Sequence, residues 1–211
     1  MSIYLRDIWS IPNPGDYKVH FGRWNKHEQP LEAWTRDRKE WQGWQEYRPQ
    51  RNEFNRPLIF SVIQFYHETD AWLFGGVFRV LACHADRYEV ELTDEGAGFI
   101  GRLKLRSRYR ERATRVDFEN HYGGFEVQEI LREPYSGRAF PDFEDIDLSF
   151  DELETLVRND RADWKAALES VKGVYLITDK KTGKRYVGSA SGEQGIFRDD
   201  NTGDRMNAFG L

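Results

Sequence analysis

Two tyrosines in the last quarter of the chain have the residue type and spacing best suited to chemistry. Tyr175 closes the triplet GVY at 173–175, and Tyr186 opens the triplet YVG at 186–188. Short apolar runs on either side of a polar, Gly-containing turn predict a hairpin that brings the two side chains together. Two phenols beside backbone groups can position a water and a phosphate, given a metal and a cation. The alternative role of such tyrosines is packing within the hairpin.

This pair of triplets, separated by ten residues, resembles the GIY-YIG endonuclease family, with Val in place of Ile at both sites. The resemblance implies that Tyr175 acts as the general base for the attacking water, with help from Tyr186. It implies that Gly173 and Gly188 allow tight backbone packing at the site, and that Arg198 stabilises phosphate charge in the transition state. It also implies a partial GIY-YIG α/β hairpin domain and Mg²⁺ as the cofactor of the complete enzyme.

The metal ligand is where this sequence departs from the family. The family binds its divalent metal through a glutamate well downstream of the second triplet, and only 23 residues follow Gly188. We therefore assign no metal ligand. We expect a truncated, frameshifted or naturally inactive form of a DNA endonuclease, with little or no cleavage activity of its own.

Basic residues occupy every second position from 102 to 112, in GRLKLRSRYRERATR. Alternate side chains of an extended strand share one face, so this spacing predicts a row of cations roughly 35 Å long. Arg suits bidentate phosphate contacts, and such a row is typical of a surface that binds nucleic acid in a salt-dependent way. The alternatives are a solvated edge strand and internal pairing with Asp and Glu. The predicted nucleic-acid-binding residues are Arg102, Lys104, Arg106, Arg108, Arg110 and Arg112.

Aromatic residues surround Gly75–Gly76, a glycine pair inside an apolar run that predicts a bulge or sharp bend. A small bent barrel with aromatics at its mouth can hold a flipped base by stacking. This arrangement loosely resembles PUA-like domains, some of which read modified bases. The resemblance implies a modification-dependent restriction enzyme used against phage, with modified duplex DNA as its partner. The predicted base-pocket residues are Phe65, Tyr66, Trp72 and Phe74, and the alternative is that they form the core.

The elements that must position these residues predict an α+β fold. The apolar spacing predicts a helix over 30–47 with one buried face, formed by Leu31, Trp34, Trp41 and Trp44. Strands are predicted over 58–66, 72–81, 87–92, 99–109 and 125–131, which favours a strongly bent sheet or small β-barrel with flanking helices. Two further helices are predicted at 149–157, after a capping box, and at 161–171.

These elements divide the chain into three parts. A strand-rich recognition domain is expected at 1–145, an acidic helical connector at 146–171 and the GIY-YIG nuclease domain at 172–211. The acidic surplus of the connector is most simply a solvated helical face. Its charge would also repel nucleic acid, which would keep the binding surface elsewhere.

Composition excludes several classes of protein. The 211 residues carry 36 acidic and 31 basic side chains, a net charge of −5, which is unlike a uniformly basic DNA binder. Aromatics reach 15%, too many for a disordered chain. The single Cys83 excludes an internal disulfide framework. The sequence has no apolar run long enough to predict a membrane span, so we expect a cytoplasmic protein. The rival functions are a non-catalytic nucleic-acid-binding module and an RNA-directed one; the oligomeric state is not indicated.

Overall fold

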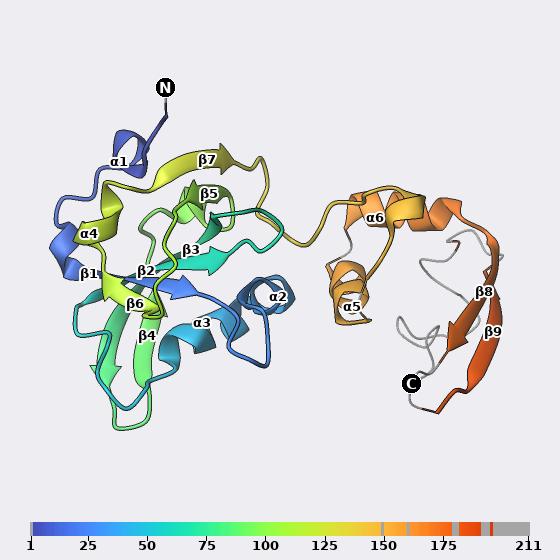
Figure 1. Cartoon of the computed structure of the whole chain (residues 1–211), viewed down its shortest axis with the longest axis horizontal. Coiled ribbons are helices and arrows are strands. Elements are labelled where there is room, and N and C mark those ends of the chain that lie inside the picture. The colour runs from blue at the N-terminus through green and yellow to red at the C-terminus, as the bar shows by residue number, and fades with distance from the viewer. Residues whose placement is uncertain (1, 149, 160, 179–181, 191–194, 196–211) are drawn as a thin grey trace. The chain divides into compact units, whose positions relative to one another are not determined.

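The computed structural model describes residues 2–148, 150–159, 161–178, 182–190 and 195 (Figure 1). Contacts divide the chain into an N-terminal unit, Met1–Tyr135, and a C-terminal unit, Ser136–Leu211. The division falls earlier than the expected boundary at 145, so the helices of the expected connector belong to the same unit as the hairpin. Within the described ranges, none of the helices combines the length and apolarity needed to cross a bilayer.

A seven-stranded sheet forms the N-terminal unit. Its path runs β6 (Arg115–Asp117), β1 (Tyr17–Gly22), β2 (Leu58–Gln64), β3 (Ala71–Cys83), β5 (Leu103–Arg106) and β7 (Glu126–Ile130), with β4 (Tyr88–Leu92) also paired to β3. Strands β1 and β2 are parallel, and the other neighbours are antiparallel. The sheet is strongly curled into a half-barrel (Figure 1), which confirms the predicted mixed fold with a bent sheet.

The helices of this unit are short. They are α1 (Leu5–Ile8), α2 (Pro30–Arg36), α3 (Arg38–Glu46) and α4 (Glu119–Tyr122), with 3₁₀ turns at Pro14–Asp16 and Ala97–Phe99. The single helix predicted over 30–47 is therefore wrong in one respect: Asp37 is extended and separates α2 from α3. Its side chain accepts a hydrogen bond from the Lys39 amide, 2.8 Å away, and so caps the second helix. The predicted apolar face is confirmed, since Leu31, Trp34 and Trp41 are buried.

The glycine pair in β3 produces the predicted irregularity. The β2–β3 register shifts between Ser61 and Val62, which leaves Gly75 as an extra residue in β3, and Gly76 has φ +115°. A Cβ on Gly75 would lie 2.5 Å from Nε1 of Trp41, so only glycine allows α3 to approach the sheet this closely. The bulge divides β3 into an end that pairs with β5 and an end that pairs with β4.

Both faces of the central strands are buried. Phe60 and Val62 of β2 contribute to one apolar cluster, whereas Ile59 and Ile63 contribute to the other. This follows from the alternation of side chains along a strand, and it explains why β2 is an almost continuous apolar run. Helices α2 and α3 supply Leu31, Trp34 and Trp41 to the second cluster.

The C-terminal unit contains a 3₁₀ turn at Phe143–Asp145, the helices α5 (Phe150–Arg158) and α6 (Ala162–Ser170), and the two-stranded sheet β8 (Gly173–Thr178) and β9 (Arg185–Ala190). Both helices and the hairpin are as predicted, although Ser149 of the expected capping box lies outside the described residues. Trp164 of α6 is buried, and its indole Nε1 donates to the Arg138 carbonyl at 2.7 Å.

Two strands were not predicted from the sequence, and the length of a third was overestimated. Strand β1 and its antiparallel partner β6 fall outside the predicted elements, and β6 is only three residues long. The strand expected over 99–109 is shorter, because β5 ends at Arg106.

His20 of β1 is a buried polar residue between the sheet and α3. Its Nδ1 is hydrogen-bonded to Oε1 of Gln45, and its ring stacks on Trp41 with an interplanar angle of 6°. The Gln45 amide nitrogen already donates to the Trp41 carbonyl, so Oε1 is the acceptor and Nδ1 carries the proton. Burial, helped by the nearby Arg115 charge, lowers the pKa of His20 from 6.5 to about 3.

We predict that acid destabilises this unit through His20. Below pH 6.5 the unfolded chain protonates this imidazole while the folded chain does not, so the free energy of unfolding falls as pH falls. Between about pH 7 and about pH 5 the His20 contribution is about 2 kcal/mol. Urea denaturation at both pH values should show it for the native chain.

Two variants separate the contribution of His20 from that of other titratable groups. One of those groups is His121, because burial lowers its pKa as well. His20→Gln should lose about 2 kcal/mol of the pH dependence, whereas His84→Gln, on an exposed turn, should keep all of it. An unchanged pH dependence in His20→Gln would contradict the prediction.

Candidate functional site

The tyrosine hairpin of the C-terminal unit brings its two phenols to one face. In the β8–β9 register Tyr175 lies opposite Gly188, and Tyr186 lies opposite Ile177. Directly opposed residues project to the same side of an antiparallel pair, so Tyr175 and Tyr186 are diagonal neighbours. Their ring centroids are 6.4 Å apart, and Tyr186 is 58% exposed. A solvent-accessible pair of phenols therefore exists where the sequence predicted one.

The two glycines of the triplets have different environments. A Cβ on Gly188 would lie 2.3 Å from Cζ of Tyr175 and 2.4 Å from its hydroxyl oxygen, so the Tyr175 ring lies directly over this glycine. A Cβ on Gly173 would meet nothing within 4 Å. The tight packing implied for both glycines is thus present at Gly188 and absent at Gly173, which sits at the first position of β8 opposite Ala190.

The remaining residues implied by the family resemblance are not available in this hairpin. Arg198 lies outside the described residues. No group of three or more His, Cys, Asp or Glu side chains in the described part of the chain could hold a metal ion. The described residues therefore do not fit a divalent metal, and we derive no step through one.

The basic segment differs from the predicted row of six cations. Only Lys104 and Arg106 lie in β5, and residues 107–112 follow it outside any strand. Strand β5 ends there because its partner β3 begins at Ala71. The amide of Ser107, just after β5, donates to the carbonyl of Asp70, in the turn before β3. The single cationic face predicted from the alternation is therefore wrong, because alternation requires an extended chain.

Three of the six cations are committed to partners inside the fold. Lys104 is buried and its ammonium lies 2.5 Å from Glu68 and 3.1 Å from Glu129. Arg102 donates to the carbonyls of Leu131 and Gly98, and Arg110 is paired with Asp70 at 2.9 Å. Arg106, Arg108 and Arg112 are exposed, and no ion pair joins them to the described acidic residues. These three arginines are the accessible part of the predicted interface that lies outside ion pairs, since Arg110 is 73% exposed but paired with Asp70.

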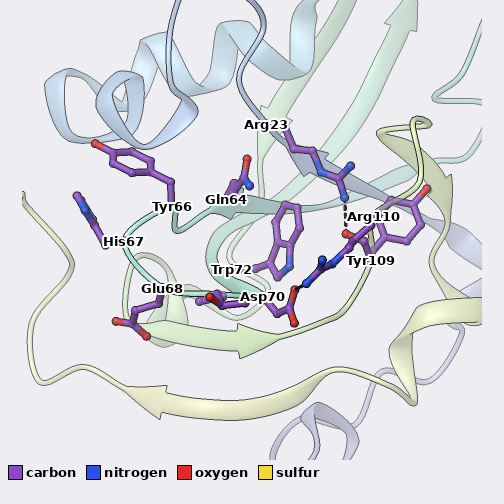
Figure 2. A pocket seen from close by; sticks show the side chains of 11 residues that line it. Arg23, Gln64, Tyr66, His67, Glu68, Asp70, Trp72, Tyr109 and Arg110 are labelled. Carbon is purple, nitrogen blue, oxygen red and sulfur yellow. Dashed lines mark hydrogen bonds and ion pairs between the residues drawn. The ribbon is translucent and has the colours of Figure 1, made fainter.

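A cavity of about 460 Å³ lies beside this segment (Figure 2). The sheet brings its walls together: the parallel strands β1 and β2 end at the same edge, where β3 begins and β5 ends. Its lining includes Arg23, Gln64, Tyr66, Asp70, Trp72 and Tyr109. Of the four predicted pocket residues, Trp72 and Tyr66 line the cavity. Phe65 and Phe74 lie instead in the second and first apolar clusters, because their side chains face the sheet's packed sides.

A cation held between aromatic rings forms one wall of this cavity (Figure 2). The Arg23 guanidinium lies 5.2 Å from the Trp72 ring centroid and 5.1 Å from that of Tyr109, and it donates to the backbone carbonyls of Tyr109 and Glu111. Trp72 Nε1 donates to the Ser107 carbonyl at 3.0 Å. Burial lowers the pKa of Arg23 and raises that of Tyr109. The Arg23 guanidinium and the Trp72 indole of this wall are therefore both held by backbone carbonyls.

Several residues of this cavity were missed by sequence reasoning. Arg23, Gln64 and Asp70 belong to strand ends and a turn, and no motif marks them. The one available signal was the turn after a buried strand, residues 65–70, which joins β2 to β3. This turn carries four polar or charged side chains in succession, His67, Glu68, Thr69 and Asp70. Turns at one edge of a sheet are common places for binding residues.

Comparisons with known proteins give no family for this chain: no family model matches it, and neither a curated protein nor a solved structure matches it.

We predict that alanine at Gly188 displaces the Tyr175 ring, because its Cβ would occupy the position of that ring. Gly173→Ala is the matched control, since the same methyl group there meets open space. Spectra of chain labelled at its tyrosine rings should show Tyr175 and Tyr186 resonances shifted by Gly188→Ala and unchanged by Gly173→Ala. Equal shifts in both variants would show that the ring does not lie over Gly188.

Proposed function

We propose that this chain is a DNA-directed protein of the GIY-YIG endonuclease type. Its N-terminal unit binds DNA, with modified duplex DNA as the substrate class, and its C-terminal unit carries the tyrosine hairpin of a phosphodiester-hydrolysing centre. The observation that carries the proposal is the pairing of Tyr175 with Tyr186 on one accessible face of β8–β9.

The hairpin supports hydrolysis through the position of the Tyr175 hydroxyl. The ring is held over Gly188 and beside Tyr186, so its oxygen is fixed relative to the sheet. A positioned phenol can accept a proton from an attacking water, and a second phenol nearby can orient that water or a phosphate oxygen. In this proposal Tyr175 is the general base and Tyr186 assists it.

The exposed arginines of the N-terminal unit support DNA binding. Arg106, Arg108 and Arg112 lie within seven residues of one another on one exposed segment. Glu111 is an exposed opposite charge in the same segment, so the local excess is positive while the whole chain is negative. Phosphates are the groups that such arginines bind best, because a guanidinium offers two parallel donors.

A non-catalytic DNA-binding protein is the second candidate. It is favoured by the lack of any three-residue acidic or histidine cluster in the described part of the chain. In that case the hairpin only packs or contacts a partner, and the two tyrosines stabilise β8–β9 as a cross-strand pair.

We predict that DNA binding depends on salt through the exposed arginines. Replacing Arg106, Arg108 and Arg112 together by Gln should make the slope of log K against log salt less negative by about 3, at about 0.9 per lost phosphate contact. Fluorescence anisotropy with a labelled duplex measures this slope. The matched control replaces three exposed arginines elsewhere, Arg51, Arg79 and Arg87, and should leave it unchanged. Equal slopes in both triple variants would refute this interface.

We predict at most slow nicking of supercoiled plasmid in the presence of Mg²⁺, and Tyr175→Phe should abolish whatever nicking the native chain shows. Removing one hydroxyl deletes the general base without changing the ring that packs on Gly188, so the fold should persist. Tyr122→Phe, which removes a phenol from the N-terminal unit, is the control and should retain nicking. Retained DNA binding with no nicking by the native chain would favour the non-catalytic candidate, and nicking that survives Tyr175→Phe would overturn the proposed centre.

A further inference from the structure

We propose that the exposed loop 24–27, which follows β1, binds an unpaired base of DNA, with Trp24 as the stacking platform. This inference rests on the proposed DNA-directed function and names the form of DNA that the N-terminal unit prefers, a duplex interrupted by a single-stranded gap. Trp24 is 59% exposed, although tryptophan is highly buried on average. It is not among the residues that line the cavity, so its ring is offered on an open surface.

The loop that carries Trp24 is closed by hydrogen bonds within its own turn. The side-chain oxygen Oδ1 of Asn25 accepts hydrogen bonds from the amides of His27 and Glu28, each at 2.9 Å. Within this turn Lys26 has φ +80°, which is uncommon for a residue other than glycine. The turn constrains the backbone beside Trp24, and a constrained loop loses less conformational entropy when it binds a ligand.

The chain that leads into this loop runs beside the segment of exposed arginines. The Phe21 amide donates to the Thr114 carbonyl at 2.7 Å, which continues the antiparallel pairing of β1 with β6 past the start of β6. Further along, Nη1 of Arg23 donates to the Glu111 carbonyl at 2.7 Å. Trp24 follows directly, so its loop adjoins the C-terminal end of the basic segment.

The charge around this aromatic ring is positive. Lys26 and Arg112 are exposed, and neither forms an ion pair with an acidic residue in the described part of the chain. The acidic Glu28 is paired with Arg36 of α2 at 2.7 Å, so it does not offset these cations. Glu111 is an exposed acidic residue in the neighbouring segment. Cations that flank an aromatic ring suit a strand whose phosphates alternate with stacking bases.

An exposed ring favours an unpaired base over a paired one. Bases inside a duplex are already stacked on their neighbours, and extruding one costs the free energy of unpairing and unstacking. A base in a single-stranded gap can stack on Trp24 without that cost. Every base has a π-face, so this contact needs no particular sequence. The phosphates on either side of the base can then contact Lys26 and Arg112.

A protein partner fits this surface less well. Exposed tryptophan also anchors many protein interfaces, but lysine is depleted from them. A protein would have to supply an apolar pocket for Trp24 and separate acidic groups for Lys26 and Arg112. A nucleotide carries a planar ring and an anionic phosphate in one unit.

Fluorescence anisotropy with labelled DNA tests this inference. One probe is a continuous duplex, and the other has the same duplex arms separated by a few unpaired nucleotides. The native chain should bind the gapped probe about tenfold more tightly, which is the effect of one stacked base. Trp24→Ala should remove this preference and leave the affinity for the continuous duplex unchanged. Trp24→Phe keeps an aromatic ring and should retain most of the preference.

Tyr47→Ala is the matched control, because Tyr47 is 65% exposed at the C-terminal end of α3, outside the loop, and its variant should keep the preference. Equal binding of both probes by the native chain, or a preference that survives Trp24→Ala or is lost equally in Tyr47→Ala, would overturn the stacking site and leave the DNA-directed function standing. Absence of binding to either probe would refute both.

Sedimentation of the DNA-free chain tests the protein alternative. The native chain and Trp24→Ala should have the same mass in solution. A lower mass for Trp24→Ala would show that the ring contacts a second copy of the chain, and it would overturn the stacking site.

Discussion

The bend of β3 is the constraint on which the N-terminal unit depends. Gly75 is an extra residue in the ladder with β2, and Gly76 has a positive φ, so the strand changes direction at this point. On one side of the bend β3 pairs with β5, and on the other it pairs with β4. The bend therefore sets the curl of the sheet and fixes Trp72 at the edge where the cavity opens.

The same glycines determine what covers the sheet. The missing side chain at Gly75 makes room for Trp41 of α3, whose ring stacks on His20 in β1. His20 is then enclosed and must stay neutral, with Gln45 as its hydrogen-bond partner. The bulge in β3, helix α3 and the buried His20 imidazole thus pack together as one unit. Protonation of His20 therefore affects the packing of all three.

The sequence predicted elements well where local pattern and environment agree. The continuous apolar runs of β2 and β3, the alternation in β4 and the tyrosine hairpin are all flanked by turn residues that mark their ends. The break at Asp37 was missed because α2 and α3 share one apolar face, and only the Asp37 cap, which accepts a hydrogen bond from the Lys39 amide, separates them. Strand β6 was missed because three residues are too few to show a periodic pattern. It is defined by its pairing with β1, in which Lys18 forms an ion pair with Asp117 of β6.

The basic segment shows why charge periodicity alone does not define a binding face. Lys104 has the spacing of its neighbours, yet Glu68 and Glu129 enclose it, and neither is close to it in sequence. These partners come from the β2–β3 turn and from β7, so only the tertiary fold separates a structural cation from a free one. What remains accessible, Arg106, Arg108 and Arg112, adjoins the cavity rather than forming a long row. Only Arg106, Arg108 and Arg112 are both exposed and outside the ion pairs of the described residues, so the alternating spacing overstates the charged face that the fold presents.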